Sequence, residues 1–316
     1  MLQRLRIAKY RFVLEPLEQM SLPPHKGATL RGAFGQAFKR MACSQSGQTC
    51  KSCPEHDRCA YSYIFETPVP PDSQVLRTHR AVPRPFVFEP PLDAKTQYGV
   101  NDNLAFGLVL VGRAIDYLPY FVLSFKALGE VGLGRGRARF RLKQVWAKDP
   151  LAPWETLLYD GPSDALRNVQ MPVGIAEIEG AVAGLPDHDL CVDFLTPTRL
   201  KHSGRIVREP AFHVLVRALL RRISSLYYFH CGERWDTDYR GLIDLAKAVE
   251  TVEAHTSWEH WQRHSSKQGH RIPMGGVMGH MRYAGPIRQF LPLLVLGSVV
   301  HVGKGCVFGH GRYVLK

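Results

Sequence analysis

The sequence lacks a long run of apolar residues. Its longest apolar stretch, at 290–300, is interrupted by Pro292 and Gly297 and falls well short of the roughly 20 residues that a membrane-spanning helix needs. The N-terminal segment carries basic residues where a signal peptide would have an apolar core. We therefore expect a cytoplasmic protein with no membrane partner.

Acidic residues are also scarce. The chain of 316 residues has 28 Asp and Glu against 41 Lys and Arg, which leaves a formal net charge of +13. An excess of positive charge favours polyanionic partners, nucleic acid ahead of an anionic membrane, although a generically soluble basic protein is the alternative. With 45% hydrophobic and 22% charged residues, the composition excludes intrinsic disorder as the main state. The length predicts about two domains of roughly 150 residues each.

The order of the expected elements is the same in both halves of the chain. Each half runs strand, helix, middle strands, helix, a turn of glycines and cations, and strand. Apolar residues at helical spacing predict the first helix over 30–41 and its counterpart over 212–226. This order is typical of the β-α-β-β-α-β motif, so the predicted fold class is α+β with two tandem ferredoxin-like domains.

Local patterns set the expected boundaries. Residues 43–103 have little periodicity and many prolines, which is unusual for a connection within a compact domain unless something organises it. In the second half we also expect a helix over 239–254, strands near 258–261 and 277–283, and a last helix that Pro286 begins. The expected domains are an N-terminal ferredoxin-like domain at 1–150 with a Cys-rich insertion at 43–103, a linker region at 151–186, and a C-terminal ferredoxin-like domain at 187–316.

Four of the seven cysteines lie close together in the expected insertion. Cys43, Cys50, Cys53 and Cys59 have the spacing C-x6-C-x2-C-x5-C, in which the C-x2-C pair can reach one tetrahedral metal and the outer two can close the site. The pattern predicts a structural zinc held by four thiolates, which would also organise the long connection. Reduced thiols and an iron–sulfur cluster are the alternatives.

Two glycine-rich turns, 132–137 and 303–312, occupy equivalent places in the two halves. Glycine leaves the backbone unhindered, so its N–H groups can approach an anion, and the neighbouring Lys and Arg add charge. One such turn is explained equally well as a tight turn without function, but two in a basic protein favour RNA or DNA phosphate. The candidate RNA-binding residues are Lys26, Arg135, Arg137, Arg199, Lys201, Arg205, Gly303, Lys304, Gly305, Gly309, Gly311 and Arg312.

Several segments resemble the Cas6 (Cas-six) superfamily of CRISPR precursor-RNA processing endoribonucleases, of the RAMP class. The similarity is carried by Gly275–Gly279 with Gly303–Tyr313, by Thr196–Lys201, by Leu30–Gly35 and by Gly132–Arg137, and the C-terminal turn is the most specific of these. The resemblance implies two ferredoxin-like domains with an RNA-binding cleft between them. It also implies cleavage of CRISPR repeat RNA without a catalytic metal, in which the 2′-hydroxyl attacks the adjacent phosphate. The products would be crRNA with a 2′,3′-cyclic phosphate and a 5′-hydroxyl.

The resemblance also guides the choice of catalytic residues, because the family often has a catalytic histidine at or near its first helix. His25 precedes that helix and is the candidate general base, since a pKa near 6.5 suits both proton uptake and release. An ordinary exposed turn is the alternative for His25. Arg31 is the candidate for charge stabilisation, Tyr10 would assist if its strand ends near the cleft, and His202 is the second candidate base. His56 and His79 are further candidates.

Two other functions stay open at this point. A RAMP subunit without catalysis would use the same turns and charge to hold guide RNA among other Cas subunits of an effector complex. A zinc-containing nucleic-acid-binding protein unrelated to CRISPR is the third reading, and the repeated order of the glycine motifs argues against it.

Overall fold

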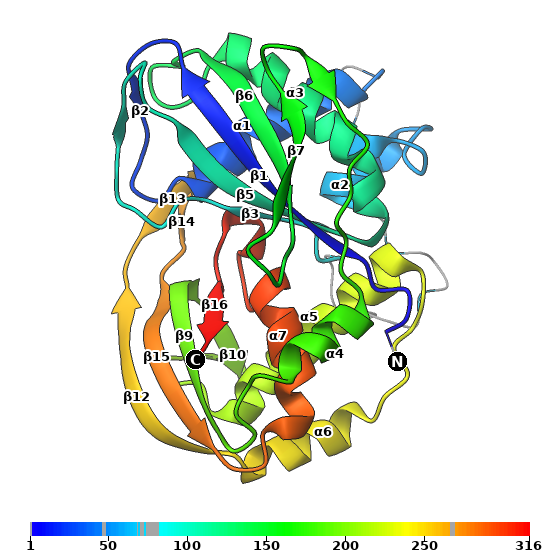
Figure 1. The fold of residues 1–316 in the computed structure, drawn as a ribbon, viewed down its shortest axis with the longest axis vertical. Coiled ribbons are helices and arrows are strands. Elements are labelled where there is room, and N and C mark those ends of the chain that lie inside the picture. The colour runs from blue at the N-terminus through cyan, green and yellow to red at the C-terminus, as the bar shows by residue number, and fades with distance from the viewer. Residues whose placement is uncertain (1, 46–48, 68, 70–72, 74–81, 266–268) are drawn as a thin grey trace. The chain divides into compact units, whose positions relative to one another are not determined.

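The chain forms two compact units, each of which contains segments that are not contiguous in the sequence (Figure 1). The computed structural model describes residues 2–45, 49–67, 69, 73, 82–265 and 269–316. The N-terminal unit comprises Arg4–Val173 and Ser225–Glu233, and the C-terminal unit comprises Gly174–Ser224 and Arg234–Lys316 with Leu2 and Gln3. None of the described helices is long and apolar enough to cross a membrane.

The N-terminal unit is built on a six-stranded antiparallel sheet of order β3-β5-β1-β6-β7-β8. Its first four members, with helices α1 and α3, give the β-α-β-β-α-β order in which β1 lies between β5 and β6. The bounds are β1 (Ile7–Pro16), β3 (Phe86–Glu89), β5 (Leu104–Val111), β6 (Phe140–Lys148), β7 (Glu155–Asp160), β8 (Ala165–Leu166), α1 (Gly27–Ala42) and α3 (Leu118–Val131).

An aromatic core joins α1 and α3 to this sheet. The apolar residues of α1 recur at helical spacing and bury one face, while Lys39 and Arg40 lie exposed in its last turn. The ring of Phe34 lies 4.8 Å from that of Phe121 and 5.2 Å from that of Phe125, both on α3. Burying such rings is the main free-energy gain of the unit, because each removes a large apolar area from water.

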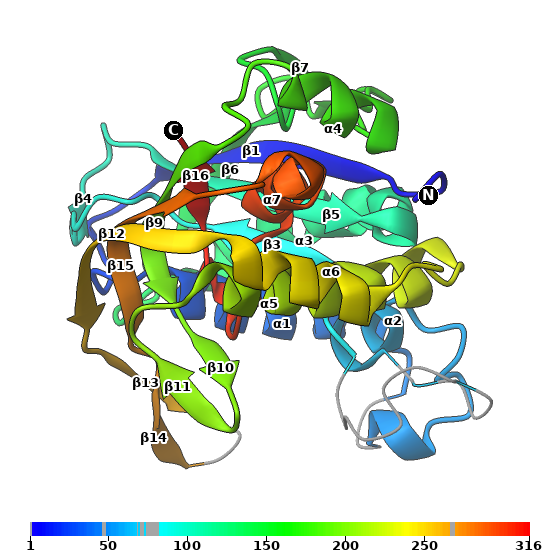
Figure 2. The same ribbon diagram turned by 90° about the horizontal axis from the view of Figure 1, so that it is seen from below.

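The C-terminal unit repeats the motif with a four-stranded antiparallel sheet of order β12-β15-β9-β16. Helices α5 and α7 pack together where α7 has Gly297, since a Cβ there would overlap the side chain of Leu219 on α5. Two hairpins, β10–β11 and β13–β14, project away from the sheet (Figure 2). The bounds are β9 (Asp189–Thr198), β10 (Leu200–His202), β11 (Arg205–Val207), β12 (Glu250–Glu259), β13 (Gln262–Ser265), β14 (His270–Pro273), β15 (Gly276–Ala284), β16 (Tyr313–Leu315), α5 (Phe212–Leu226) and α7 (Leu291–Val300).

Shorter elements complete the two units. They are β2 (Met20–Ser21), β4 (Gln97–Tyr98), α2 (Ala60–Glu66), α4 (Ile175–Val182), α6 (Tyr239–Leu245), the 3-10 turns η1 (Cys50–Ser52), η2 (Gly112–Tyr117), η4 (Ala246–Ala248), η5 (Arg288–Phe290) and η6 (Cys306–Phe308), and the π-helical turn η3 (Tyr227–Cys231).

The η3 segment belongs to the N-terminal unit although it follows α5 in the sequence. His230 is buried there, with Nδ1 3.2 Å from the hydroxyl of Tyr63 and Nε2 2.7 Å from the carbonyl oxygen of Pro83. Gly112 lies against the backbone of His230, where a Cβ would overlap the carbonyl oxygen. The unit therefore depends on a segment that lies far from the rest of it in the sequence.

The predicted α+β class with two tandem ferredoxin-like motifs is confirmed, while several expected boundaries differ. The helix expected over 239–254 ends at Leu245, because 250–259 pair with β15 as β12. Pro286 does not begin the last helix, which starts at Leu291 with Pro292 in its first turn. The segment 151–186, expected as a linker, contains β7 and β8, which extend the N-terminal sheet, and α4.

Candidate nucleic-acid interface

The C-terminal glycine turn is held in shape by left-handed backbone at four positions. Gly303, Gly305, Gly309 and Gly311 have φ values of +86°, +84°, +89° and +70°. A Cβ at Gly311 would overlap the carbonyl oxygen of Val302, so only glycine fits there.

The backbone N–H groups of Gly309 and Gly311 are both hydrogen-bonded within the protein. Gly311 N–H donates to the carbonyl oxygen of Pro197 at 3.2 Å, and Gly309 N–H donates to that of Cys306 at 2.9 Å. These two amides are therefore engaged within the protein, and RNA binding by Gly309 and Gly311 stays a prediction. The glycines at 309 and 311 allow the turn to pack against the end of β9.

The turn brings Lys304 beside three other cations, which we name the cation cluster: Arg199, Lys201, Arg221 and Lys304. Lys304 is exposed as a whole residue, but partial desolvation of its ammonium lowers its pKa, and the positive charges of Lys201, Arg199 and Arg221 lower it further. The backbone N–H of Lys304 donates to the carbonyl oxygen of Arg199 at 3.2 Å, which fixes the turn against β9. Like charges held this close favour a bound anion, because an anion relieves their repulsion.

Three members of the cation cluster were predicted from the sequence, and Arg221 was missed. It lies on the exposed face of α5, in a helix whose apolar spacing had been used only to find the core. Arg205 is exposed in β11, beside the turn of the β10–β11 hairpin, and Arg312 is half-buried with its N–H donating to Oγ1 of Thr196 at 2.9 Å.

His202 lies in the same hairpin as Lys201. Its ring is 5.4 Å from that of His213 at the start of α5, with the two planes nearly perpendicular. Nδ1 of His202 is buried and has no hydrogen-bond partner among the described residues. Burial lowers the pKa of His213, and the neighbouring His202, Arg217 and Lys247 lower it further, so this imidazole is held towards its neutral form.

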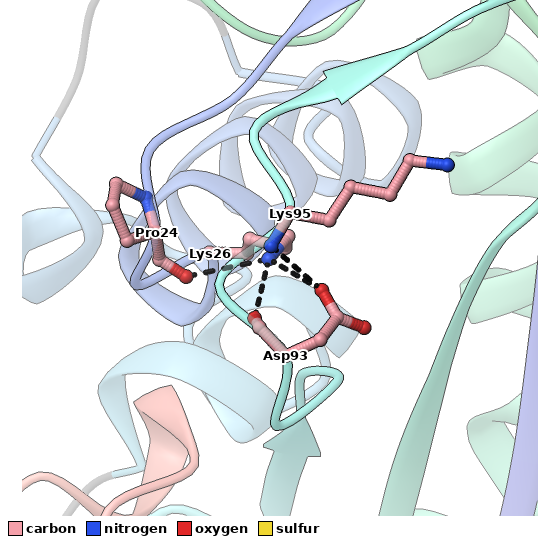
Figure 3. A network of polar contacts seen from close by, with 4 residues as sticks. All are labelled: Pro24, Lys26, Asp93 and Lys95. Carbon is pink, nitrogen blue, oxygen red and sulfur yellow. Dashed lines mark hydrogen bonds and ion pairs between the residues drawn. The ribbon is translucent and has the colours of Figure 1, made fainter.

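The turn before α1 contains His25 and Lys26, and the structure gives the two residues different environments. His25 is half-buried, whereas Lys26 is 0% exposed. Nζ of Lys26 donates to the carbonyl oxygens of Pro24 (3.3 Å) and Asp93 (3.0 Å) and lies 3.3 Å from Oδ1 of Asp93, while the Lys95 ammonium points away (Figure 3). Lys26 therefore ties the helix start to the 93–95 loop, and the prediction that it contacts RNA is wrong.

Tyr10 and Arg31, the other two catalytic candidates of the N-terminal unit, both contact neighbouring parts of that unit. Tyr10 is fully buried in β1, its hydroxyl has no hydrogen-bond partner among the described residues, and burial raises its pKa well above the usual value. It is part of the core, so it does not face a bound substrate. The guanidinium of Arg31 lies 5.1 Å from the ring centre of Phe65 on α2, in a cation–π contact.

The N-terminal glycine turn exposes its charged residues. Arg135, Gly136 and Arg137 are all exposed, and Arg137 has a positive φ of +51°. Leu133 and Ala138 pair across the base of the turn, which keeps it narrow.

The four cysteines proposed to bind zinc lie near one another without forming a closed ligand set. The charges of Cys59 and Cys43 are close enough to raise the pKa of Cys50, after the larger effect of burial. Among the described residues, no three of these sulfurs lie within 4.8 Å of one another. The zinc site stays a prediction: elemental analysis of the purified chain should find one zinc per chain, and its absence would overturn the prediction. His79 lies outside the described residues.

A different group of possible metal ligands was missed in the sequence. Glu253 and His255 on β12 and His280 on β15 have ligand atoms within 4.8 Å of one another. His255 and His280 are direct cross-strand partners, so only the strand register reveals them. Their side chains are largely open to solvent, and Nε2 of His255 lies 2.6 Å from Oε1 of Glu253, within hydrogen-bond distance.

Comparison with known proteins agrees with this architecture. Residues 5–171 match the model of the AF_1859_N N-terminal domain, and residues 192–313 match that of the CRISPR-associated endoribonuclease Cas6. No curated protein sequence matches the chain.

Solved structures with the same fold cover nearly all of the chain. A Thermus thermophilus Cas6 in a product complex has a TM-score of 0.61 at 15% identity, over 98% of this chain and 100% of that chain. A second Cas6 product complex has a TM-score of 0.53 at 15% identity, over 98% and 99%. A partial Cas6-RT-Cas1–Cas2 complex has a TM-score of 0.59 at 14% identity, over 100% of this chain and 47% of that one.

Proposed function

We propose that this chain, whose residues 192–313 match the family model of the CRISPR-associated endoribonuclease Cas6, is a Cas6 enzyme that cleaves CRISPR repeat RNA to release crRNA. The RNA is its substrate and product. Other Cas subunits are its proposed protein partners, since a chain of the same fold occurs in a Cas6-RT-Cas1–Cas2 complex.

In the proposed reaction, the RNA itself supplies the nucleophile. The 2′-oxygen forms a bond to the adjacent phosphorus, and the bond from that phosphorus to the 5′-oxygen of the next nucleotide breaks. A general base takes the proton of the 2′-hydroxyl, and a general acid delivers one to the leaving 5′-oxygen. The products carry a 2′,3′-cyclic phosphate and a 5′-hydroxyl, and positive charge stabilises the transition state.

The cation cluster is the observation that carries this proposal. Arg199, Lys201 and Arg221, from β9–β10 and α5, lie near enough to Lys304 in the C-terminal turn for their charges to lower its pKa, after the larger effect of desolvation. Binding of a phosphodiester to neighbouring cations of this kind is favourable, because the negative charge relieves their mutual repulsion. The cluster thus supports binding of an RNA backbone at the C-terminal unit.

His25 stays the proposed general base. It lies two residues before α1, whose first turn contains no acidic residue, and the positive end of a helix favours a phosphate there. Arg31 stays the proposed stabilising cation. His202, beside Lys201 of the cation cluster, is the second candidate base.

A cleavage assay tests the function directly. The purified chain is incubated with end-labelled repeat RNA in EDTA, and again with the same RNA carrying a 2′-deoxy substitution at the scissile nucleotide. We expect cleavage in EDTA that disappears with the deoxy substrate. Tight binding of repeat RNA without any cleavage would instead make the chain an RNA-binding subunit, and cleavage of the deoxy substrate would exclude 2′-hydroxyl attack.

A further inference from the structure

We infer that the C-terminal unit has a pocket for an unpaired nucleobase, which lies next to the cation cluster and rests on the proposed binding of RNA. The pocket has a volume of about 500 Å³ and is located where β12 ends and the β13–β14 hairpin begins. That volume falls within the range of ligand-binding cavities in proteins. The residues that the argument uses are Arg199, Trp258, Trp261, Arg271 and Gly275.

Two tryptophans supply flat apolar surface to this pocket. Trp258 and Trp261 are half-buried, and each has a neighbour that holds its ring. The guanidinium of Arg208 lies 5.6 Å from the ring centre of Trp258, and the ring of His310 lies 5.3 Å from that of Trp261. Because partly exposed indole rings bury apolar surface by stacking, they suit a planar aromatic ligand.

Glycine at position 275 keeps the pocket open beside Trp258. A Cβ there would lie 3.1 Å from Nε1 of Trp258 and would overlap the carbonyl oxygen of Glu259. Any side chain at this position would therefore press on the edge of the indole.

The positively charged residues around the pocket favour a nucleotide over an uncharged planar ligand. Arg199 is shared with the cation cluster, and its Nη1 donates to the carbonyl oxygen of Pro273 at 2.7 Å, which anchors it at the pocket wall. Arg271 lines the pocket from β14 and is exposed. No acidic residue is among the described lining residues. Aromatic rings for a base beside cations for its phosphate match single-stranded RNA.

The ligand is an unpaired base because a paired base hides its faces in the helical stack. Bases in loops and at ends can turn outward and stack on aromatic side chains. Loss of one such stack weakens binding between about fivefold and 150-fold. The pocket therefore binds the base of a nucleotide that lies outside the base-paired part of the RNA.

An abasic scan combined with tryptophan substitutions tests this inference. Repeat RNA with a 2′-deoxy scissile nucleotide is prepared with an abasic site at each unpaired position in turn. Its affinity is measured for the full-length wild type, Trp258→Ala and Trp261→Ala. Trp154→Ala is the matched control, since Trp154 is 69% exposed and belongs to the N-terminal unit.

We expect Trp261→Ala to weaken binding about tenfold, whereas Trp154→Ala binds as the wild type does. One abasic position should weaken binding to the wild type and have no further effect in Trp261→Ala. If every abasic position weakens both proteins equally, or if both pocket variants bind as the wild type does, the inference is wrong. Should the alanine variants fail to fold, Trp261→Phe and Arg271→Gln replace them, with Phe expected to retain most of the affinity and Gln to lose part of it.

A separate arm distinguishes failure of this inference from failure of the proposed function. If the wild type neither cleaves the repeat nor prefers it to an unrelated hairpin, the proposed function fails. The pocket is then judged on single-stranded oligouridine. Weaker binding by Trp261→Ala supports the pocket, and equal binding overturns it.

Discussion

The two glycine-and-cation turns occupy the same place in the same motif, yet they differ in what surrounds their charges. In the N-terminal turn, Arg135 and Arg137 are exposed in a narrow turn. In the C-terminal turn, Lys304 is exposed too, but it lies beside cations from two other parts of its unit. The sequence pattern that the two segments share therefore determines that each forms a tight turn. The packing around each turn determines whether other cationic side chains lie beside it.

Substitution of the two candidate bases tests which unit supplies the general base. We expect His25→Ala to slow single-turnover cleavage at least 100-fold, because loss of a general base costs about 10²–10⁴-fold. His202→Ala should slow it less than about tenfold. The rates are measured at saturating protein, so that altered affinity does not enter. The reverse order of effects would place the base in the C-terminal unit, beside the cation cluster.

The glycines of the two turns should differ in their effect on stability. We expect Gly311→Ala to lower the free energy of unfolding by at least ~3 kcal/mol, since φ is positive and a Cβ overlaps the carbonyl oxygen of Val302. Gly136→Ala should change it by less than about 0.5 kcal/mol, because nothing lies within 4 Å of a Cβ there. Urea unfolding followed by circular dichroism measures both. Equal losses would show that the two turns are packed alike.

Charge removal should separate the turns in RNA binding. We expect Lys304→Ala to weaken binding of uncleavable repeat RNA about tenfold and to reduce the slope of log affinity against log salt by about 1. Arg135→Ala removes the same charge from the N-terminal turn, where no such cluster surrounds it among the described residues, and should weaken binding less than about threefold. Fluorescence anisotropy at several salt concentrations measures both. Equal effects would mean that both turns contact phosphate.

The pH dependence of binding gives the smallest effect. The pKa of Lys304 is lowered by partial desolvation of its ammonium and by its cationic neighbours, and a bound phosphate raises it again. Binding therefore takes up a proton, and affinity should fall as pH rises towards the ordinary lysine value of about 10.4. Lys304→Arg keeps its charge and should flatten this fall. A wild type and an arginine variant with the same pH profile would contradict the role of Lys304.

Periodicity explains why much of the fold was predictable from the sequence. The spacing of Leu30, Phe34 and Phe38 marks the buried face of α1, and equal spacing in 212–226 marks α5. These patterns depend on residues within one element, so they survive without knowledge of the partner. The sequence pattern predicts helix for residues 250–254, whereas their pairing with β15 makes them part of a strand.

The candidate site was only partly predictable, because its properties depend on residues far apart in the sequence. The sequence around Lys26 suggests a free cation, but its ammonium contacts Asp93, which lies in a loop far away in the sequence. Arg221 joined Lys304 only through the packing of α5 near the C-terminal turn. Burial and charge coupling of this kind are set by tertiary contacts, which no local pattern contains.

Because η3 is synthesised well after the main segment of the N-terminal unit, this unit stays incomplete during part of translation. The N-terminal unit ends its main segment at Val173 but needs Ser225–Glu233, so 233 − 173 = 60 further residues must be made before it is complete. At a translation speed of about 5–20 residues per second, this takes roughly 3–12 s. Until then, Tyr63 lacks its buried partner His230, and the backbone at Gly112 has nothing packed against it from η3. The nascent unit therefore passes through a stage with an open, partly apolar surface that chaperones can bind.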